Sequence, residues 1–449
     1  MITWNDIDRL HPVKTENLPR NRQIAGADLD SRRISEGMLF IARRGEKVDG
    51  HKFIGDALQK GTLAALVEED WYAMASPGRD WPLIVVRDTD DTLRELAVLV
   101  REKFDGPVLG ITGSNGKTTT KEMVSRILSH RYIVLATPGN FNNLWGLPLT
   151  ILRAQSHHDF WVLEHGMNRP GEIEELCRIS QPNAGLITSI SEVHSENFDS
   201  IEAIAEEKFS LFNAVPDDGL CFQNLSDPYI RQYRKDDRTI SFGLDINGDF
   251  PGQILGTDRF ERVLLHVENL GKARLPLPGE FQALNALAAV AVGVTFQVNP
   301  DDALKTLEEF PAIPGRTNIL ERHGKTVIDD SYNANPASMR AALDILSNYP
   351  AENRRVAILG DMLELNSTRV QKHRDLGEYA AKKGIDLIIG VGELSRYMVN
   401  AAEQANATGH HVPDTDACTK ILSDLLEDGD VILVKGSHGI ELERVVEAI

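Results

Sequence analysis

The chain has 449 residues, of which 42% are hydrophobic and 26% are charged, and this length allows about three domains that each bury a core. The formal net charge of −19 argues against a general binder of nucleic acid or of anionic membranes. Because no apolar stretch approaches the ~20 residues of a membrane span and the three cysteines are far apart, we expect a cytoplasmic protein with free thiols and without membrane insertion.

The first predicted domain covers residues 1–86. Short apolar runs alternate there with glycine-containing turns, a pattern typical of a small α/β domain. The runs that we predict as strands are residues 38–42, 63–67 and 83–86. Residues 1–52 carry ten Lys or Arg against eight Asp or Glu, so an anionic ligand is better tolerated here than elsewhere. A stretch with helical spacing of apolar residues, 93–100, comes next, and we place the boundary before it.

The second predicted domain covers residues 87–313. Strands and helices alternate along it, which predicts a parallel sheet with crossover helices. The strands are expected at residues 107–112, 160–163 and 185–190, and the helices at 173–179, 201–212 and 283–294. Two prolines, Pro311 and Pro314, break the pattern and mark the end of the domain.

The third predicted domain covers residues 314–449 and alternates again. We expect strands at residues 327–329, 356–359, 387–391 and 431–434, and helices at 337–346, 375–383 and 419–426. This pattern indicates a second doubly wound, Rossmann-like domain. The glycines at 390 and 392 do not predict a dinucleotide site, because Ser395 stands where the third glycine is needed.

A glycine-rich loop, residues 113–118, lies between a predicted strand and a predicted helix. This order makes a phosphate-binding loop credible, because backbone N–H groups and the helix N-terminus then face the phosphates. Lys117 is placed to reach the β- and γ-phosphates of ATP, and Thr118 to put its hydroxyl on Mg²⁺. The loop is short: only Ser114 and Asn115 separate its glycines, and Ile111 stands where the general pattern has its first glycine.

The loop and its surroundings, GITGSNGKTTTKEM at residues 110–123, resemble the ATP loop of the Mur ligase family. Nearly the whole chain resembles the family in the same order, at residues 30–32, 37–40, 45–46, 49–51, 137–148, 164–173, 194–200, 360–365 and 435–437. The tract DDSYNANP at 329–336 is the most discriminating. It is similar to the family member that adds a dipeptide, whereas sister ligases typically carry a different sequence there.

The resemblance implies an ATP-dependent ligase that adds D-alanyl-D-alanine to UDP-N-acetylmuramoyl-tripeptide during peptidoglycan precursor synthesis. The tripeptide carboxylate would attack ATP and form an acyl phosphate, which the dipeptide amine would then attack. The implied protein is a monomer, and its implied fold has three domains: a uridine-nucleotide domain, a central ATPase domain and a Rossmann-like domain. Since two domains would contact ATP, we expect closure about a hinge near Pro314.

The resemblance also implies roles for individual residues. Catalysis would depend on Lys117, Glu164, His194 and Lys208. Two Mg²⁺ ions would be held by Thr118, Glu164, His194 and a carbamylated Lys208. ATP would contact Gly113, Ser114, Asn115, Gly116, Lys117, Thr118, Thr119, Asn285, Arg316 and Asp330. The substrates would contact Ser31, Arg32, Asp49, His51, Asn140, Asn142, Asn143, Tyr332, Asn333 and Asn335.

Other interpretations stay open at this point. Taken alone, Lys208 reads as a solvated cation and Glu164 as a solvated loop acid, and Asn333 and Asn335 as residues that order a turn. The chain departs from the family pattern at Leu144, Trp145, His165, Ser195, Phe281, Gln282 and His438. One alternative is therefore a Mur-like amide ligase with a different pair of substrates. Another is a nucleotide switch without ligase activity, against which the intact metal and phosphate residues argue.

Overall fold

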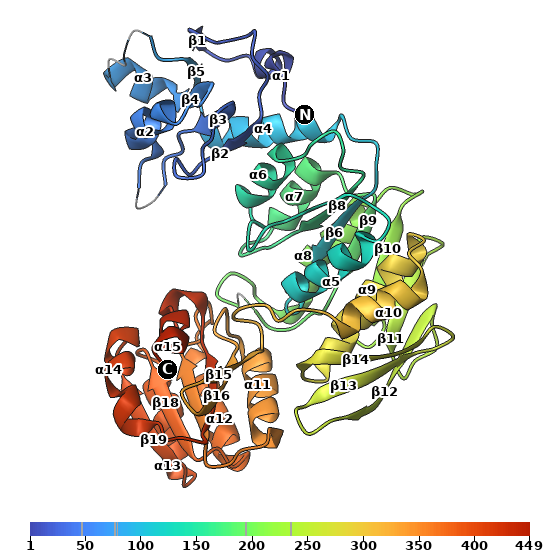
Figure 1. The fold of residues 1–449 in the computed structure, drawn as a ribbon, viewed down its shortest axis with the longest axis vertical. Coiled ribbons are helices and arrows are strands. Elements are labelled where there is room, and N and C mark those ends of the chain that lie inside the picture. Colours follow the sequence, from blue (N-terminus) through green and yellow to red (C-terminus); the bar gives the residue numbers. More distant parts are fainter. Residues whose placement is uncertain (46–47, 76–77, 79, 194, 234–235) are drawn as a thin grey trace.

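The protein is described here as a computed structural model that covers residues 1–45, 48–75, 78, 80–193, 195–233 and 236–449. Figure 1 shows three α/β bodies that follow one another along the chain, each built on one sheet. The predicted fold class is thus confirmed. Within the described ranges, no helix combines the length and the apolarity that crossing a bilayer demands.

The amino-terminal body is built on a five-stranded sheet with the order β1-β5-β4-β3-β2. β1 runs antiparallel to β5, and the other neighbours are parallel. The predicted runs form β3, β4 and β5, whereas β1 and β2 have three residues each and no apolar run that would reveal them. The elements are α1 (Trp4–Arg9), β1 (Lys14–Glu16), β2 (Gly26–Asp28), β3 (Met38–Ile41), η1 (Gly50–Phe53), α2 (Ile54–Gln59), β4 (Ala64–Glu68), α3 (Glu69–Ala75) and β5 (Leu83–Val86).

Helix α4 (Thr89–Arg101) joins the first body to the second. Asp88 caps it by accepting a hydrogen bond from the Asp91 N–H, and Leu93, Leu96 and Val100 lie on its buried face. The helix packs against α6 (Gly146–Leu152) and α7 (Glu172–Ser180). One apolar cluster therefore continues from the amino-terminal sheet into the central body.

The central body has a nine-stranded sheet with the order β14-β13-β12-β11-β10-β9-β6-β8-β7. Helices α5, α9 and α10 cover one face, and α4, α6, α7 and α8 cover the other. The strands from β6 to β12 are parallel, and β13 and β14 are antiparallel. The elements are β6 (Val108–Thr112), α5 (Lys117–Leu128), β7 (Val134–Ala136), β8 (Phe160–Glu164), β9 (Ala184–Ile187), α8 (Ile201–Ala214), β10 (Leu220–Asn224), η2 (Ile230–Gln232), β11 (Thr239–Leu244), β12 (Phe250–Thr257), β13 (Arg262–Val267), β14 (Gly271–Pro278), α9 (Phe281–Thr295) and α10 (Pro300–Glu308).

Two sequence expectations in this body were wrong in detail. The strand expected through Ile190 ends at Ile187, because the segment from Thr188 onward turns to bond the glycine-rich loop. The helix expected from residue 283 begins two residues earlier, since α9 starts at Phe281.

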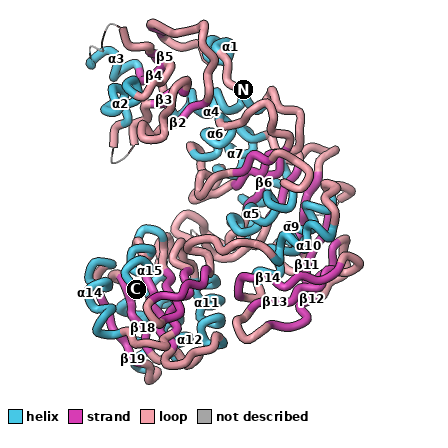
Figure 2. The backbone as a smooth tube through the Cα atoms, in the orientation of Figure 1, coloured by secondary structure: helices cyan, strands magenta, loops and turns pink. Residues whose placement is uncertain are grey.

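The carboxyl-terminal body has a six-stranded sheet with the order β15-β16-β20-β17-β18-β19, parallel except for β15. Figure 2 shows the strands between two layers of helices, with α11, α12 and α13 on one side and α14 and α15 on the other. This is the doubly wound arrangement that was predicted. The elements are β15 (Asn318–Arg322), β16 (Lys325–Asp329), α11 (Pro336–Asn348), β17 (Arg355–Gly360), α12 (Arg369–Lys382), β18 (Leu387–Val391), α13 (Ser395–Gln404), β19 (Thr408–Val412), α14 (Thr415–Leu425), β20 (Val431–Lys435), η3 (His438–Ile440) and α15 (Glu443–Ala448).

Candidate active site

The glycine-rich loop lies between β6 and α5, at the carboxyl edge of the central sheet. Gly113 and Gly116 have φ angles of +151° and +81°, which disfavour residues with side chains. A Cβ at Gly113 would lie 1.9 Å from Thr188 Oγ1, and one at Gly116 would lie 2.3 Å from Asn285 Oδ1. Both glycines are therefore required by backbone conformation and by close packing, as a loop that brings its N–H groups to a phosphate needs.

The segment that follows β9 holds this loop in shape. The Ser114 N–H donates to Ser189 O at 2.7 Å, and Ser114 Oγ donates to Ser191 O at 2.9 Å. The Asn115 N–H donates to Ser189 Oγ at 3.0 Å, and Asn115 O accepts from Thr188 Oγ1 at 2.6 Å. The side chains of the predicted ATP residues Ser114 and Asn115 therefore bond the protein itself.

Lys117 begins α5 and is half-buried. Its Nζ donates to Gly113 O at 2.7 Å. Burial lowers the pKa of the lysine, the charge of Glu164 raises it, and the charge of Arg316 lowers it. A phosphate group against this ammonium would offset the cost of its burial.

Glu164 ends β8 and is 1% exposed, so the interpretation as a solvated loop acid is wrong. Its Oε1 accepts hydrogen bonds from Asn142 Nδ2 at 2.8 Å and from Thr118 Oγ1 at 3.3 Å. Its Oε2 is buried and has no hydrogen-bond partner among the described residues. A buried carboxylate oxygen without a partner is costly, and a hard divalent cation such as Mg²⁺ would satisfy it.

Glu164 and Thr118 thus fit the predicted first Mg²⁺ site. In the part of the chain that is described, no three His, Cys, Asp or Glu side chains gather closely enough to complete a metal site. Phosphate and water oxygens would have to supply the other ligands, as is usual for Mg²⁺. His194, the predicted ligand of a second ion, lies outside the described residues.

Lys208 lies on α8 and is 1% exposed, so it is not a solvated cation. Its Nζ has a weak donor contact with Met167 Sδ at 3.6 Å. Burial holds the pKa of the lysine well below its usual value, the charge of Lys117 lowers it further, and Glu207 raises it. These conditions favour a neutral amine, the form that reacts with CO₂.

Arg316 reaches the loop from the carboxyl-terminal body. Its Nη2 donates to Thr118 Oγ1 at 3.2 Å, and its guanidinium lies 3.8 Å from the centre of the Tyr332 ring. The other neighbour of that ring is His438, stacked at 5.4 Å between centroids. The aromatic stack therefore holds a cation where the phosphates of ATP are expected.

The tract 329–336 places its predicted residues differently from one another. Asp330 is paired with Lys435 at 2.6 Å and accepts from the Thr317 N–H at 3.1 Å. Asn333 is exposed, and its Oδ1 accepts from the Ala334 N–H. Asn335 caps α11 through the Ser338 N–H at 2.9 Å and reaches the glycine-rich loop with its other amide atom. Asn335 therefore orders the tract, while Asn333 remains open to a ligand.

Asn285 and Thr119 lie behind the loop and are largely buried. Asn285 Oδ1 accepts from Thr120 Oγ1 at 3.2 Å, and its Nδ2 donates to Gln282 at 3.0 Å. The amide that was predicted on the adenine side therefore also joins α9 to α5.

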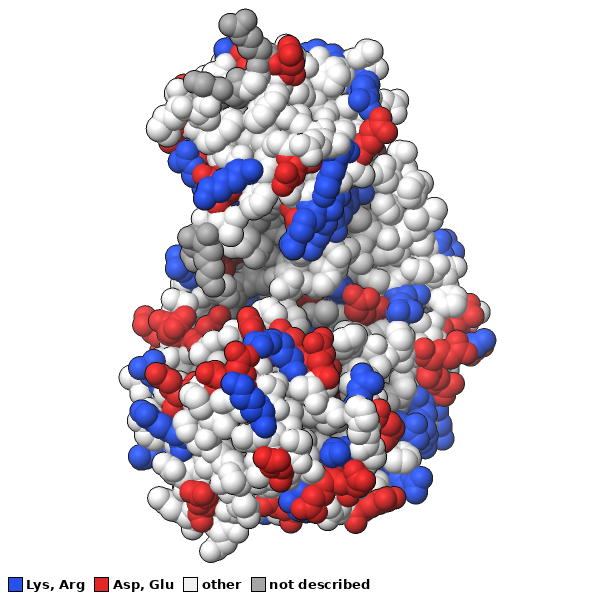
Figure 3. Space-filling view, turned by 60° about the vertical axis from the view of Figure 1, so that its left-hand side comes forward, with Lys and Arg blue, Asp and Glu red and all other residues white. Residues whose placement is uncertain are grey.

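The segment 137–148 runs from the glycine-rich loop toward the amino-terminal body. Asn140 interacts with Tyr332, and Asn142 bonds Glu164. Asn143 Oδ1 accepts from the Gly146 N–H at 2.9 Å and so caps α6. Figure 3 shows a hollow between the two lobes of this face, with Lys and Arg side chains gathered on its upper rim and acidic ones below.

In the amino-terminal body, the predicted substrate residues differ in how free they are. Arg32 is exposed, although it pairs with Asp30 at 2.8 Å, and Ser31 is buried. His51 Nδ1 donates to Asp49 at 2.7 Å, and its Nε2 accepts from the Glu68 N–H at 3.1 Å. Both ring nitrogens of His51 are thus occupied, so the structure gives His51 and Asp49 a role inside the domain.

Two contacts at the junction of these bodies were not found from the sequence. Arg43 lies 4.0 Å from the ring centre of Trp145, which is 40% exposed. Phe141 lies between Arg33 and Arg153, at 5.1 and 5.2 Å from the ring centre. Arg43 and Arg33 are far from Trp145 and Phe141 in the chain, so no local pattern could reveal these two contacts.

Asp227 and Asn224 were also missed, although a signal was present. Asp227 Oδ2 accepts from the Ile190 N–H at 2.7 Å, and Asn224 Nδ2 donates to Thr188 O at 2.8 Å. They hold the segment that bonds the glycine-rich loop. Both come at or just after the carboxyl end of β10, the position that directed attention to Glu164.

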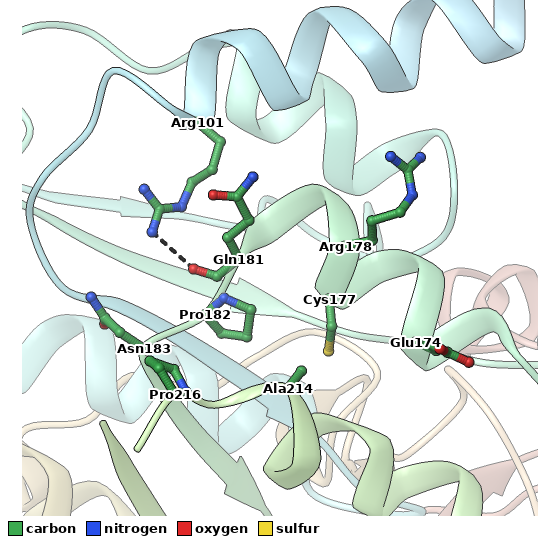
Figure 4. A pocket seen from close by; sticks show the side chains of 9 residues that line it. All are labelled: Arg101, Glu174, Cys177, Arg178, Gln181, Pro182, Asn183, Ala214 and Pro216. Carbon is green, nitrogen blue, oxygen red and sulfur yellow. Dashed lines mark hydrogen bonds between the residues drawn. The ribbon is translucent and has the colours of Figure 1, made fainter. Parts of the chain in front are cut away.

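A second hollow, of about 520 Å³, lies at the amino ends of β6 and β9, away from the glycine-rich loop. Figure 4 shows its lining, in which the Arg101 guanidinium bonds the Gln181 carbonyl. Two further carbonyls, of Ser180 and Phe104, also accept from Arg101. Burial raises the pKa of the lining Cys177 thiol to about 12, which disfavours the reactive thiolate at neutral pH.

Comparisons with known proteins give matches along most of the chain. The Mur ligase middle domain matches residues 111–293, the Mur ligase glutamate ligase domain matches 315–438, and the Mur ligase family catalytic domain matches 23–99. UDP-N-acetylmuramoyl-tripeptide–D-alanyl-D-alanine ligases from Bacillus subtilis (strain 168) and Escherichia coli (strain K12) are 32% and 33% identical to the chain. The first comparison covers 94% of this chain and 93% of the relative, and the second covers 96% of each.

Solved structures give the same result. A crystal structure of MurF from Acinetobacter baumannii has a TM-score of 0.83 and 30% identity, over 99% of this chain and 98% of that one. A MurF ligase from Thermotoga maritima in complex with ADP has a TM-score of 0.76 and 29% identity, over 95% and 96%.

A side chain at position 116 should impair nucleotide binding because it would clash with Asn285, in addition to the strain of a left-handed backbone. Gly116→Ala adds a clash with Asn285, whereas Gly384→Ala, at a φ of +73°, meets no atom within 4 Å. We expect Gly116→Ala to weaken binding of an ATP analogue about 10- to 100-fold, the equivalent of one or two lost phosphate hydrogen bonds. Calorimetric titration checks this, and equal affinities for the two variants would contradict the assignment of the loop.

His165 predicts a loss of stability in acid. The side chain is fully buried against Ser180 Oγ and Leu163 O, and burial lowers its pKa from 6.5 to about 4. Between these values the unfolded chain binds more protons than the folded one, so stability falls as pH falls through this window. Relative to His165→Leu, the wild type should lose about 3 kcal/mol of unfolding free energy between pH 7 and pH 4.

Urea unfolding at several pH values measures this difference. The exposed His410 provides the control, because His410→Leu removes a histidine without removing a buried imidazole. Parallel stability curves for the wild type and His165→Leu would show that His165 is not held neutral.

Proposed function

Because the chain belongs to the Mur ligase family, we propose that it is an ATP-dependent ligase that adds D-alanyl-D-alanine to UDP-N-acetylmuramoyl-tripeptide in peptidoglycan precursor synthesis. The observation that carries the proposal is the buried Glu164 beside Thr118, with one carboxylate oxygen unbonded among the described residues and Arg316 reaching in from the next domain. We also propose that the protein is cytoplasmic and monomeric.

The reaction joins a carboxylate to an amine through an acyl phosphate. The first N–H groups of α5 and the Lys117 side chain would hold the triphosphate, and Arg316 would add positive charge from the other side. Thr118 and Glu164 would hold Mg²⁺, which, when bound, reduces the repulsion between the triphosphate and the attacking carboxylate. ATP would transfer its γ-phosphoryl group to the carboxylate and leave as ADP, and the amine would then displace phosphate from the acyl phosphate and lose a proton as the amide bond forms.

We also propose that Lys208 acts as a carbamate. The neutral amine attacks CO₂, releases one proton and becomes an anion. This anion and His194 would hold a second Mg²⁺. The support is the burial of Lys208 beside the charge of Lys117, which disfavours an ammonium there.

The proposed ligation predicts one product. Incubation with ATP, Mg²⁺, UDP-N-acetylmuramoyl-tripeptide and D-alanyl-D-alanine should give the pentapeptide, detected by mass spectrometry, with phosphate released only when both acceptor and amine are present. Lys117→Ala should abolish product while leaving the protein folded. Product with another amine but not with D-alanyl-D-alanine would favour a Mur-like amide ligase with different substrates, an alternative that Trp145 and Phe281 motivate.

The carbamate predicts a dependence on CO₂. Degassed, bicarbonate-free enzyme should lose activity and regain it on addition of bicarbonate, and Lys208→Ala should be about 100-fold less active. ¹³C NMR with labelled bicarbonate should show a carbamate signal that Lys208→Ala lacks. Lys305→Ala, at an exposed position, is the control. Full activity of Lys208→Ala would rule the carbamate out.

A further inference from the structure

Asn115 of the nucleotide loop and Asn335 of the carboxyl-terminal domain meet directly. Asn335 Nδ2 donates to Asn115 Oδ1 at 2.7 Å. The two residues lie 220 positions apart in the chain. Their hydrogen bond joins the glycine-rich loop to Asn335, the residue that caps α11.

The direction of each amide is determined by its other partners. Asn335 Oδ1 accepts from the Ser338 N–H at 2.9 Å, so only Nδ2 is left to face the loop. Asn115 must then offer Oδ1 to Asn335, and its Nδ2 donates to Ser191 Oγ at 3.1 Å. A continuous row of hydrogen bonds thus runs from α11 through the nucleotide loop to the segment that follows β9.

The neighbouring contacts between these domains are also polar. Arg316 reaches Thr118 at 3.2 Å, and the Asn366 N–H donates to Ser195 Oγ at 3.2 Å. Among the described residues, the apolar clusters of the two domains are separate, and Phe260 of the central domain packs on the carboxyl-terminal cluster. Domains joined mainly by a few polar contacts move relative to one another by default, so single hydrogen bonds have a measurable share in docking.

We propose that Asn335 and Asn115 form a positioning contact that docks the carboxyl-terminal domain on the nucleotide loop. The contact couples the shape of the loop to the placement of Arg316 and of the exposed Asn333, so that ATP is used only when the dipeptide side is in place. Asn335 then acts through Asn115 and not as a substrate ligand. This inference rests on the proposed ligase function.

Asn335→Ser separates docking from capping. Serine caps a helix about as well as asparagine, but its side chain is too short to reach Asn115. The expected result is a 2- to 12-fold loss in kcat/KM for ATP, roughly the worth of one net hydrogen bond. The KM for the UDP-linked substrate and the unfolding temperature should not change. Asp414→Ser also replaces a capping side chain by serine, at α14 and far from this contact, and should alter none of these quantities.

Asn115→Ala tests the same contact from the loop side. If both residues act through one hydrogen bond, the double variant is no worse than the poorer single variant. Small-angle scattering with an ATP analogue supplies a readout apart from activity: the wild type should compact more than Asn335→Ser.

The outcomes are distinct. Additive losses, an unchanged Asn335→Ser, or an equal loss in Asp414→Ser would overturn the positioning role. If the wild type makes no pentapeptide, the proposed function fails, while analogue affinity and compaction still decide whether the contact docks the domain.

Discussion

The structure of the site depends on a buried carboxylate. Glu164 is buried at the end of β8, and one of its oxygens lacks a partner among the described residues. Burial of a charged group is tolerated only when opposite charge or hydrogen bonds surround it. Thr118 and Asn142 meet the other oxygen, and the Glu164 N–H donates to Thr137 Oγ1 at 2.9 Å. Two segments that are distant in sequence, α5 and residues 137–148, thus converge on Glu164, and each donates one hydrogen bond to its carboxylate.

The same carboxylate explains the basic groups around it. Lys117, Arg316 and Lys208 are held near one another in a chain whose net charge is −19. Burial lowers the pKa of both Lys117 and Lys208, and the neighbouring positive charges of Arg316 and Lys117, respectively, lower it further. The arrangement creates positive potential where phosphate and substrate carboxylates would bind. Lys208 is the more deeply buried of the two lysines, and its neutral form is therefore the more strongly favoured.

The sequence predicted the parts whose chemistry is local. The glycine-rich loop combines strand, glycines and helix within about a dozen residues, and Glu164 could be placed because a strand end is a local feature. The antiparallel strands β12 to β14 escaped prediction, since glycines, prolines and charges interrupt their apolar pattern. The roles of Asn335 and His51 were out of reach for another reason. Their partners depend on tertiary contacts, to Asn115 across 220 positions and to Glu68 at the end of β4 across 17 positions, which no spacing encodes.

Three of the departures from the family pattern, His165, Ser195 and Trp145, have a partner in this chain. His165 is matched by Ser180, Ser195 by the Asn366 N–H, and Trp145 by Arg43. A polar or aromatic replacement without such a match would leave an unsatisfied group, at a cost of about 1–3 kcal/mol for a buried one. Glu164, Lys117 and Thr118 are unaltered. The departures therefore change contacts that support the domains and the edge of the sheet, and these contacts affect stability and interdomain motion. The groups that would contact ATP keep the arrangement that their charges require.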